Sequence, residues 1–309
     1  MIKYKFVVCV LTFNGGDVWR KAAEALRLQT EGLARVIVID SSSHDGSDRI
    51  AQDAGFEVQR IPSSTFDHGG TRQGVVDQIS AEEIIVFLTQ DAVLRPGAIR
   101  EILASFTDPS VAMAYGRQLP HPGAGPVEAH ARCFNYPSVP MVKGKHSISA
   151  LGIKTPFCSN SFSAYRIEAL RAMGGFPDGL LFGEDMYVAA KFILSGRHIV
   201  YAASAQCEHS HNYSGIEEFK RAFDIGAFHA MNPWLLKEFG SANSEGGRFV
   251  LSELRYVFER RPLACLSVLM RNTLKYLGYR LGRKHNLLST NLKLLVTCNK
   301  AYWSRETAV

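Results

Sequence analysis

The chain has 309 residues, of which 46% are hydrophobic and 21% are charged, and its net charge is +6. This length and composition are those of a globular protein with a full core. They exclude a mainly disordered chain and a small domain that needs disulfides or metal ions to fold. The six cysteines are widely scattered without a CxxC pair, which excludes a zinc ribbon and predicts a reducing, cytoplasmic environment.

The first elements predict an α/β fold. The apolar run over 6–11 enters Thr12 without a small-residue cleavage site, so we interpret it as a buried strand rather than a signal peptide. A second buried strand is predicted over 35–40, with a helix between the two. Helices over 43–54 and 71–79, strands over 56–61 and 84–88, and a helix from Pro96 continue the alternation. The pattern predicts a mostly parallel open sheet flanked by helices, with ligands at the carboxyl ends of the strands.

The alternation stops after Gly116. Six prolines over 117–156 predict a long irregular loop, either a substrate lid or acceptor surface or a purely structural excursion. Helices are then expected over 166–173, 184–194 and 216–229, a strand over 198–202, and only helices from Gly246 onward. No uncharged apolar run of about eighteen residues occurs, so no transmembrane helix is predicted.

The stretch 255–284 carries eight Lys or Arg against one acid, Glu259, with leucines near helical spacing. It is either a surface for an anionic membrane or a packed helical pair with a solvated basic face. Its basic residues alternate with leucine rather than with aromatic residues, so membrane contact is favoured over nucleic-acid binding.

Polar residues follow three predicted strands: Thr12, Phe13 and Asn14, then Asp40, Ser41 and Ser42, then Thr89, Gln90 and Asp91. Together they predict a nucleotide pocket, in which Phe13 is an apolar wall and Asp40 accepts hydrogen bonds from base or ribose. The chain contains neither a Gly-x-Gly-x-x-Gly motif after the first strand nor a Gly-Lys-Ser/Thr loop, which argues against dinucleotide and P-loop enzymes.

Acidic residues at two places in the chain have both a structural and a chemical interpretation. Asp91 is either a turn residue or, with His209 and His211 on one face of an extended stretch, a ligand of Mg²⁺ or Mn²⁺. Glu184 and Asp185 either stabilise a helix N-terminus or supply a general base.

Together these motifs resemble the family 2 glycosyltransferases with the GT-A fold. The resemblance covers 1–230 and rests on Thr12-Phe13-Asn14, residues 38–47, Asp91 as the last acid of an Asp-x-Asp motif, Gly174-Gly175-Phe176, and Glu184-Asp185. Thr89 replaces the first acid of Asp-x-Asp, so Asp40 and backbone groups would cover the ribose. The motifs over 66–72, 88–92 and 209–214 are similar to the rhamnosyltransferase branch that builds O-antigen and related polysaccharides.

The resemblance implies a role for each candidate residue. Thr12, Phe13, Asn14, Asp40, Ser42 and Gln90 would hold the nucleotide, Asp91 with His209 or His211 the divalent metal, and Asp185 would be the base, with Glu184 and Arg72 supporting. Arg72 would reach a phosphate or the sugar, or form a surface salt bridge.

The implied reaction is inverting transfer of L-rhamnose from dTDP-β-L-rhamnose to a lipid-linked glycan at the inner face of the cell membrane. Residues 1–230 would form the catalytic domain, and 231–309 a helical extension that either associates with the membrane or packs on the domain. Three alternatives stay open: a family 2 transferase with another nucleotide sugar, a nucleotidyltransferase, and a non-catalytic glycan-binding subunit with a degenerate pocket.

Overall fold

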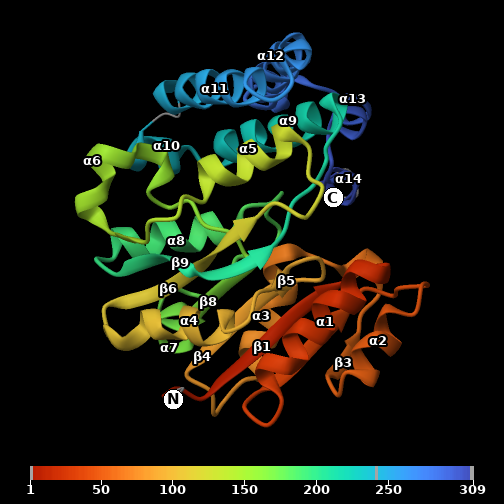
Figure 1. The fold of residues 1–309 in the computed structure, drawn as a ribbon, viewed down its shortest axis with the longest axis vertical. Helices are drawn as coiled ribbons and strands as arrows, with labels where there is room; N and C mark the ends of the chain where they lie inside the picture. Colours follow the sequence, from red (N-terminus) through yellow and green to blue (C-terminus); the bar gives the residue numbers. More distant parts are fainter. Residues whose placement is uncertain (1–2, 241–242, 307–309) are drawn as a thin grey trace.

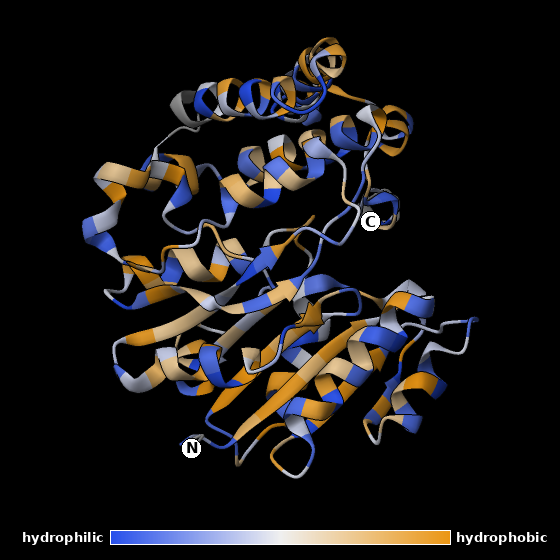
Figure 2. Ribbon diagram, viewed as in Figure 1, coloured by the Kyte–Doolittle hydropathy of each residue, from blue (hydrophilic) through white to orange (hydrophobic). Residues whose placement is uncertain are grey.

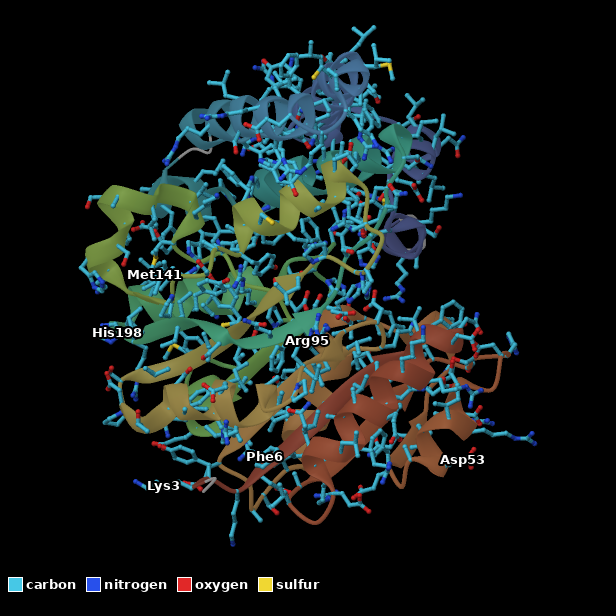
Figure 3. The ribbon with its side chains drawn as sticks, viewed as in Figure 1. Lys3, Phe6, Asp53, Arg95, Met141 and His198 are labelled. Carbon is cyan, nitrogen blue, oxygen red and sulfur yellow. The ribbon has the colours of Figure 1, made fainter. Side chains whose placement is uncertain are left out.

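A computed structural model describes residues 3–240 and 243–306, in which one mixed sheet is covered by helices on both faces (Figure 1). The strands are β1 (Phe6–Thr12), β2 (Arg35–Asp40), β3 (Glu57–Arg60), β4 (Ile84–Thr89), β5 (Val93–Leu94), β6 (Val111–Leu119), β7 (Met141–Lys143), β8 (Phe162–Arg166) and β9 (His198–Glu208). Their order is β3-β2-β1-β4-β8-β6-β9-β5, and β7 pairs with β9. Figure 3 labels Met141 and His198, which begin these two paired strands.

The helices fall into two groups along the chain. The first group is α1 (Gly16–Thr30), α2 (Ser47–Asp53), α3 (His68–Gln78), α4 (Ala98–Ala104), α5 (Pro126–Asn135), α6 (Ile148–Leu151), α7 (Ile167–Ala172) and α8 (Glu184–Leu194). The second is α9 (Gly215–Met231), α10 (Pro233–Phe239), α11 (Asn243–Phe258), α12 (Cys265–Gly282), α13 (Thr290–Val296) and α14 (Lys300–Glu306). The predicted α/β class with a helical C-terminal region is confirmed.

The first four strands of the sheet order are parallel. Of these, β1, β2 and β4 are buried on both faces, as their apolar runs predict, whereas β3 at the edge of the sheet is partly exposed. Alternate residues of β1 supply two cores. Val7 and Cys9 join the core that includes Val75 of α3, whereas Val8 packs with Trp19 of α1. Successive side chains of a strand point to opposite faces, so one apolar run serves both layers.

Strand β8 was not expected from the sequence. It lies antiparallel between β4 and β6, and it brings residues 159–161 to the edge of the sheet where β4 ends. Its sequence Phe-Ser-Ala-Tyr-Arg is rich in small residues and lacks a β-branched run, so its pairing depends on the neighbouring strands rather than on propensity.

The prediction of one long irregular loop over 117–156 is wrong. The segment contains the end of β6, the ten-residue helix α5, β7, α6 and 3₁₀ turns. Pro126 occupies the first turn of α5, where its missing N–H costs no hydrogen bond, so this proline begins a helix instead of breaking one. The rings of Phe134 and Phe249 lie 5.1 Å apart, which packs α5 against α11.

Helices α9 and α12 pack very closely because glycines line their contact. A Cβ atom at Gly278 would lie 2.3 Å from the Phe219 carbonyl oxygen, and one at Gly282 would lie 2.0 Å from that of Phe223. This contact determines which face of α12 is buried. Among residues 3–240 and 243–306, no helix has the length and apolarity needed to span a bilayer.

Candidate functional site

A pocket of about 410 Å³ opens at the carboxyl ends of β1 and β4. The strand order reverses between these two strands, and parallel α/β sheets bind ligands at such a switch point. Gln90 joins the two strand ends, because its amide oxygen accepts from Phe13 N at 2.7 Å and its amide nitrogen donates to Phe13 O at 3.0 Å. The Phe13 side chain is 51% exposed, so an apolar ring is available beside the pocket.

Three of the predicted nucleotide residues lie outside this pocket and build the strand-end loops. Asp40 is fully buried, and its carboxylate accepts from Thr12 Oγ1 at 3.2 Å and from the backbone N–H of Ser43 at 2.9 Å. The Asn14 side chain accepts from His44 N at 2.9 Å, and Ser42 Oγ donates to Ile61 O at 2.8 Å. Thr12, Phe13 and Gln90 do line the pocket, together with Arg72, Thr89 and Asp91.

Asp91, His209 and His211 form a cluster suited to a metal ion. His209 Nε2 lies 3.4 Å from Asp91 Oδ1, and His211 Nε2 lies 3.4 Å from Asp91 Oδ2. One ligand atom from each residue lies within 4.8 Å of the other two. Burial would raise the pKa of Asp91, but the contact with His209 and the nearby His211 hold the pKa below its usual value. Burial, and then the neighbouring His209, lower the pKa of His211 to about 4, so this imidazole is neutral and able to coordinate at neutral pH.

Gln118 on β6 orients His209. Its side-chain oxygen lies 3.0 Å from His209 Nδ1 and accepts from Arg132 Nη1 at 2.5 Å. An acceptor at Nδ1 selects the tautomer with its proton there, which leaves Nε2 free to face Asp91. One carboxylate oxygen and two imidazole nitrogens, oriented in this way, fit a divalent ion that keeps open positions for substrate oxygens.

The Glu184-Asp185 pair begins α8 directly after Gly183, whose φ of 78° is readily adopted by glycine. Glu184 is buried and its Oε1 accepts from Arg72 Nη1 at 2.8 Å and from Asn160 Nδ2 at 2.9 Å. Arg72 therefore forms a buried ion pair rather than a surface one. Asp185 is half-buried, and its carboxylate accepts from Asn160 N at 3.1 Å and from Met186 N at 2.7 Å.

The two adjacent carboxyl groups titrate differently. Burial opposes ionisation of Glu184, but Arg72, His68 and the hydrogen bond from Asn160 hold the pKa of Glu184 below its usual value. Burial and the negative charge of Glu184 raise the pKa of Asp185 to about 7. A partly accessible carboxyl group with a pKa near neutrality is suited to accept a proton from a bound hydroxyl.

A second cavity of about 690 Å³ adjoins the first, and both the cluster of Asp91, His209 and His211 and the side chain of Asp185 line it. His68, Arg72, Thr89 and Asp91 line both cavities. A ligand that spans both cavities would thus lie beside the Asp91, His209 and His211 cluster and reach the Asp185 carboxylate.

Residues 7–174 match the family model described as Glycosyl transferase family 2. The O-antigen chain rhamnosyltransferase RfbN of Salmonella typhimurium is 41% identical over 97% of this chain and 96% of its own length. WbaN of Salmonella anatum, an O-antigen chain rhamnosyltransferase, is 42% identical with the same coverage. The chain belongs to glycosyl transferase family 2. It is a glycosyltransferase, as the sequence motifs predict.

Solved structures share the fold of this family 2 glycosyltransferase. The mannosyltransferase PcManGT from Pyrobaculum calidifontis, in complex with GDP-Man and Mn²⁺, superposes with a TM-score of 0.59 at 14% identity. That comparison covers 99% of this chain and 86% of the other. S. aureus TarS 1-349 gives a TM-score of 0.52 at 16% identity, covering 92% of this chain and 91% of that one. At such low identity the likeness concerns the fold.

Several residues of this glycosyltransferase site were not predicted from the sequence. They are Ser63, Phe66 and His68 in the first cavity, Arg132, Asn160, Asp224, Cys298 and Asn299 in the second, and Gln118, which lines the second and holds His209. Arg132 was missed because the prolines around α5 predicted an irregular loop there, and no local pattern distinguishes Asn160. Phe66 and His68 lie within the motif over 66–72, which is the only signal for them in the sequence.

Proposed function

We propose that this glycosyltransferase moves L-rhamnose from dTDP-β-L-rhamnose to a hydroxyl of a lipid-linked glycan in O-antigen-type polysaccharide synthesis. The rhamnose assignment is supported by the two near-full-length relatives, both O-antigen chain rhamnosyltransferases. The observation that carries the mechanism is the position of Asp91, which lines both the nucleotide-sized cavity and the cavity containing Asp185.

Asp91, His209 and His211 would hold Mg²⁺ or Mn²⁺ on the donor diphosphate, and the ion would stabilise the negative charge of the leaving nucleotide. Two guanidinium groups support the same charge. Within the described residues, Nε of Arg72 and Nε of Arg132 are buried without a hydrogen-bond partner. Each lines the cavity beside the cluster, and a diphosphate oxygen would satisfy these donors.

Asp185 is proposed as the general base. Its carboxylate accepts the proton of the acceptor hydroxyl while that oxygen attacks the anomeric carbon and the bond to the diphosphate breaks. Attack from the face opposite the leaving group inverts the anomeric configuration, so a β-linked donor gives an α-L-rhamnoside. Glu184 stays ionised through Arg72 and keeps the Asp185 pKa high enough for proton transfer near neutral pH.

Calorimetric titration tests the donor assignment. Wild-type protein is titrated with dTDP-rhamnose, UDP-glucose and GDP-mannose, with Mn²⁺ and again with EDTA. We expect tightest binding of dTDP-rhamnose, dependent on Mn²⁺ and lost in Asp91→Asn. Preference for another nucleotide sugar would reject rhamnose but keep the transferase mechanism, whereas metal-independent binding would reject the Asp91 role.

The acceptor side of the proposal places the enzyme on the inner membrane face. On α12, the face opposite the α9 contact exposes Leu266, Met270 and Leu277, and Leu263 just before it is 97% exposed. Figure 2 shows hydrophobic and hydrophilic stretches side by side along the helices at this end of the molecule, α11 and α12. Exposed arginines, Arg255, Arg260, Arg261 and Arg280, accompany them. An apolar face edged by cations matches an anionic bilayer surface.

Vesicle flotation tests this contact. We expect the protein to float with phosphatidylglycerol-containing vesicles and not with pure phosphatidylcholine, and Leu263→Glu/Leu266→Glu to remain unbound. Leu28→Glu, at an exposed leucine on α1, is the control and should bind normally. Binding by the double variant at wild-type level would exclude this face as the contact.

A further inference from the structure

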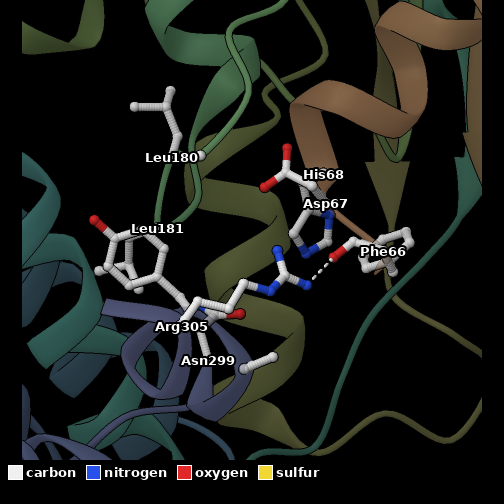
Figure 4. Close-up of a pocket in the computed structure, with 10 residues that line it drawn as sticks. Phe66, Asp67, His68, Leu180, Leu181, Asn299 and Arg305 are labelled. Atoms are coloured by element: carbon white, nitrogen blue, oxygen red, sulfur yellow. Dashed lines mark hydrogen bonds between the residues drawn. The ribbon is translucent and has the colours of Figure 1, made fainter. Parts of the chain in front are cut away.

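The last helix reaches a loop that precedes it by about 240 residues. Nη2 of Arg305 on α14 donates to Ser64 O at 2.8 Å and to Phe66 O at 2.9 Å. Figure 4 shows the guanidinium group of Arg305 directed at the Phe66 carbonyl. The C-terminal helices thus contact the N-terminal half of the chain at a specific backbone position.

The contacted loop, 63–68, forms part of the donor pocket wall. Ser63, Phe66 and His68 all line that pocket. The rings of Phe66 and His68 pack edge to face at 4.9 Å, and His68 O accepts from Arg72 Nη1 at 2.9 Å. A shift of this loop would therefore move the pocket wall and the arginine that pairs with Glu184.

The first part of loop 63–68 is weakly supported by packing, whereas Phe66 packs against the core and Asp67 caps α3 by accepting from Gly70 N at 2.7 Å. Residues 62–65 are exposed, and cavities of about 330 and 530 Å³ adjoin the loop. Arg305 and Asp67 line both cavities. A segment with little buried apolar surface opens at low free energy, so the two hydrogen bonds from Arg305 add to the support that the exposed part receives from its own turn, in which Thr65 N donates to Pro62 O at 3.0 Å.

The segment 297–305, which we call the C-terminal strap, is firmly held at its other end. Thr297 Oγ1 donates to Asp224 Oδ1 at 2.5 Å, and Cys298 N donates to Asp224 Oδ2 at 2.9 Å. Trp303 is fully buried and packs against Phe223 of α9, with ring centroids 6.3 Å apart. The strap therefore has a rigid base from which Arg305 extends.

We propose that the C-terminal strap holds loop 63–68 in its donor-binding position, with Arg305 as the positioning residue. Asp224, Cys298 and Asn299 line the cavity that contains Asp185, so the strap connects both halves of the cleft. The identity of the donor rests on the function proposed above, whereas the support of the loop does not. Residues beyond 230 are then part of the catalytic unit and not a separable extension.

The test compares Arg305→Met, which removes both hydrogen bonds but keeps the length of the side chain, with Arg305→Lys and with Lys300→Met. Lys300 is exposed on the same helix and serves as the matched control. Amide hydrogen exchange of loop 63–68 is measured without donor, and KM for dTDP-rhamnose and kcat are measured with Mn²⁺. For Arg305→Met we expect about tenfold faster exchange in the loop and about a tenfold higher donor KM, with kcat nearly unchanged.

Partial recovery of slow exchange and low KM in Arg305→Lys, and wild-type values in Lys300→Met, would support the proposal. Unchanged exchange in Arg305→Met would overturn it, and so would faster exchange with an unchanged donor KM. If wild-type protein neither bound nor used dTDP-rhamnose, the proposed function would fail, while the exchange experiment would still decide whether Arg305 holds the loop.

Discussion

Replacing Glu184 with glutamine removes a negative charge that acts on two neighbours. The charge pairs with Arg72, and it raises the pKa of Asp185. The Arg72 and Glu184 side chains are 3% and 7% exposed, with 2.8 Å between Nη1 and Oε1. Breaking a buried ion pair by removing one charge costs about 3–5 kcal/mol. Glutamine keeps an oxygen for Asn160 and Arg72, so we expect the lower end, about 3 kcal/mol. For a chain of 309 residues this corresponds to a melting temperature lowered by about 5 °C.

The same substitution changes the pH dependence of transfer. Asp185 must be deprotonated to act as a base, so the rate rises with pH through its pKa of about 7. The negative charge of Glu184 is the second cause of that raised pKa, after burial. Removing this charge lowers the pKa of Asp185, and the acidic limb of the pH–rate profile moves to lower pH.

Initial rates of Glu184→Gln across the pH range and its thermal melting measure both effects. Glu31→Gln is the control, because Glu31 pairs with Arg27 at the surface with its side chain 70% exposed. It should melt within about 1 °C of wild type, with the same pH profile. A Glu184→Gln protein with an unshifted limb would refute the electrostatic coupling of the two carboxyl groups, and an unchanged melting temperature would refute the buried-pair argument.

Further substitutions test the proposed base, the candidate metal site and the helix packing. Asp185→Asn should lower transfer about a thousandfold in a product assay while calorimetry finds donor binding intact, and normal transfer would remove Asp185 from the mechanism. Gln118→Leu should weaken Mn²⁺ binding at least about tenfold by calorimetry, because His209 loses its orienting acceptor, and unchanged affinity would contradict that role. Gly278→Val should destabilise the protein by about 1–3 kcal/mol in denaturant unfolding, since its Cβ would collide with Phe219 O, and wild-type stability would disprove the close packing.

The sequence determined the features that depend on local periodicity. Apolar runs such as 35–40 identify strands covered on both faces, and in parallel strands the residues that follow them meet at one edge of the sheet. The i, i+2 spacing of His209 and His211 likewise predicted that both would face Asp91. These inferences succeeded because backbone geometry over a few residues decides the direction of each side chain.

Only the tertiary structure decided which distant residues complete the site. Asp40 and Asn14 have the residue types of nucleotide ligands, and only the fold shows that their oxygens also accept the hydrogen bonds that build the strand-end loops. Gln118 meets His209 across 91 positions, and Arg305 meets Phe66 across 239. Such partners share no local pattern, because their contact arises from how β6, β9 and α14 pack, and packing depends on the shape of the whole core.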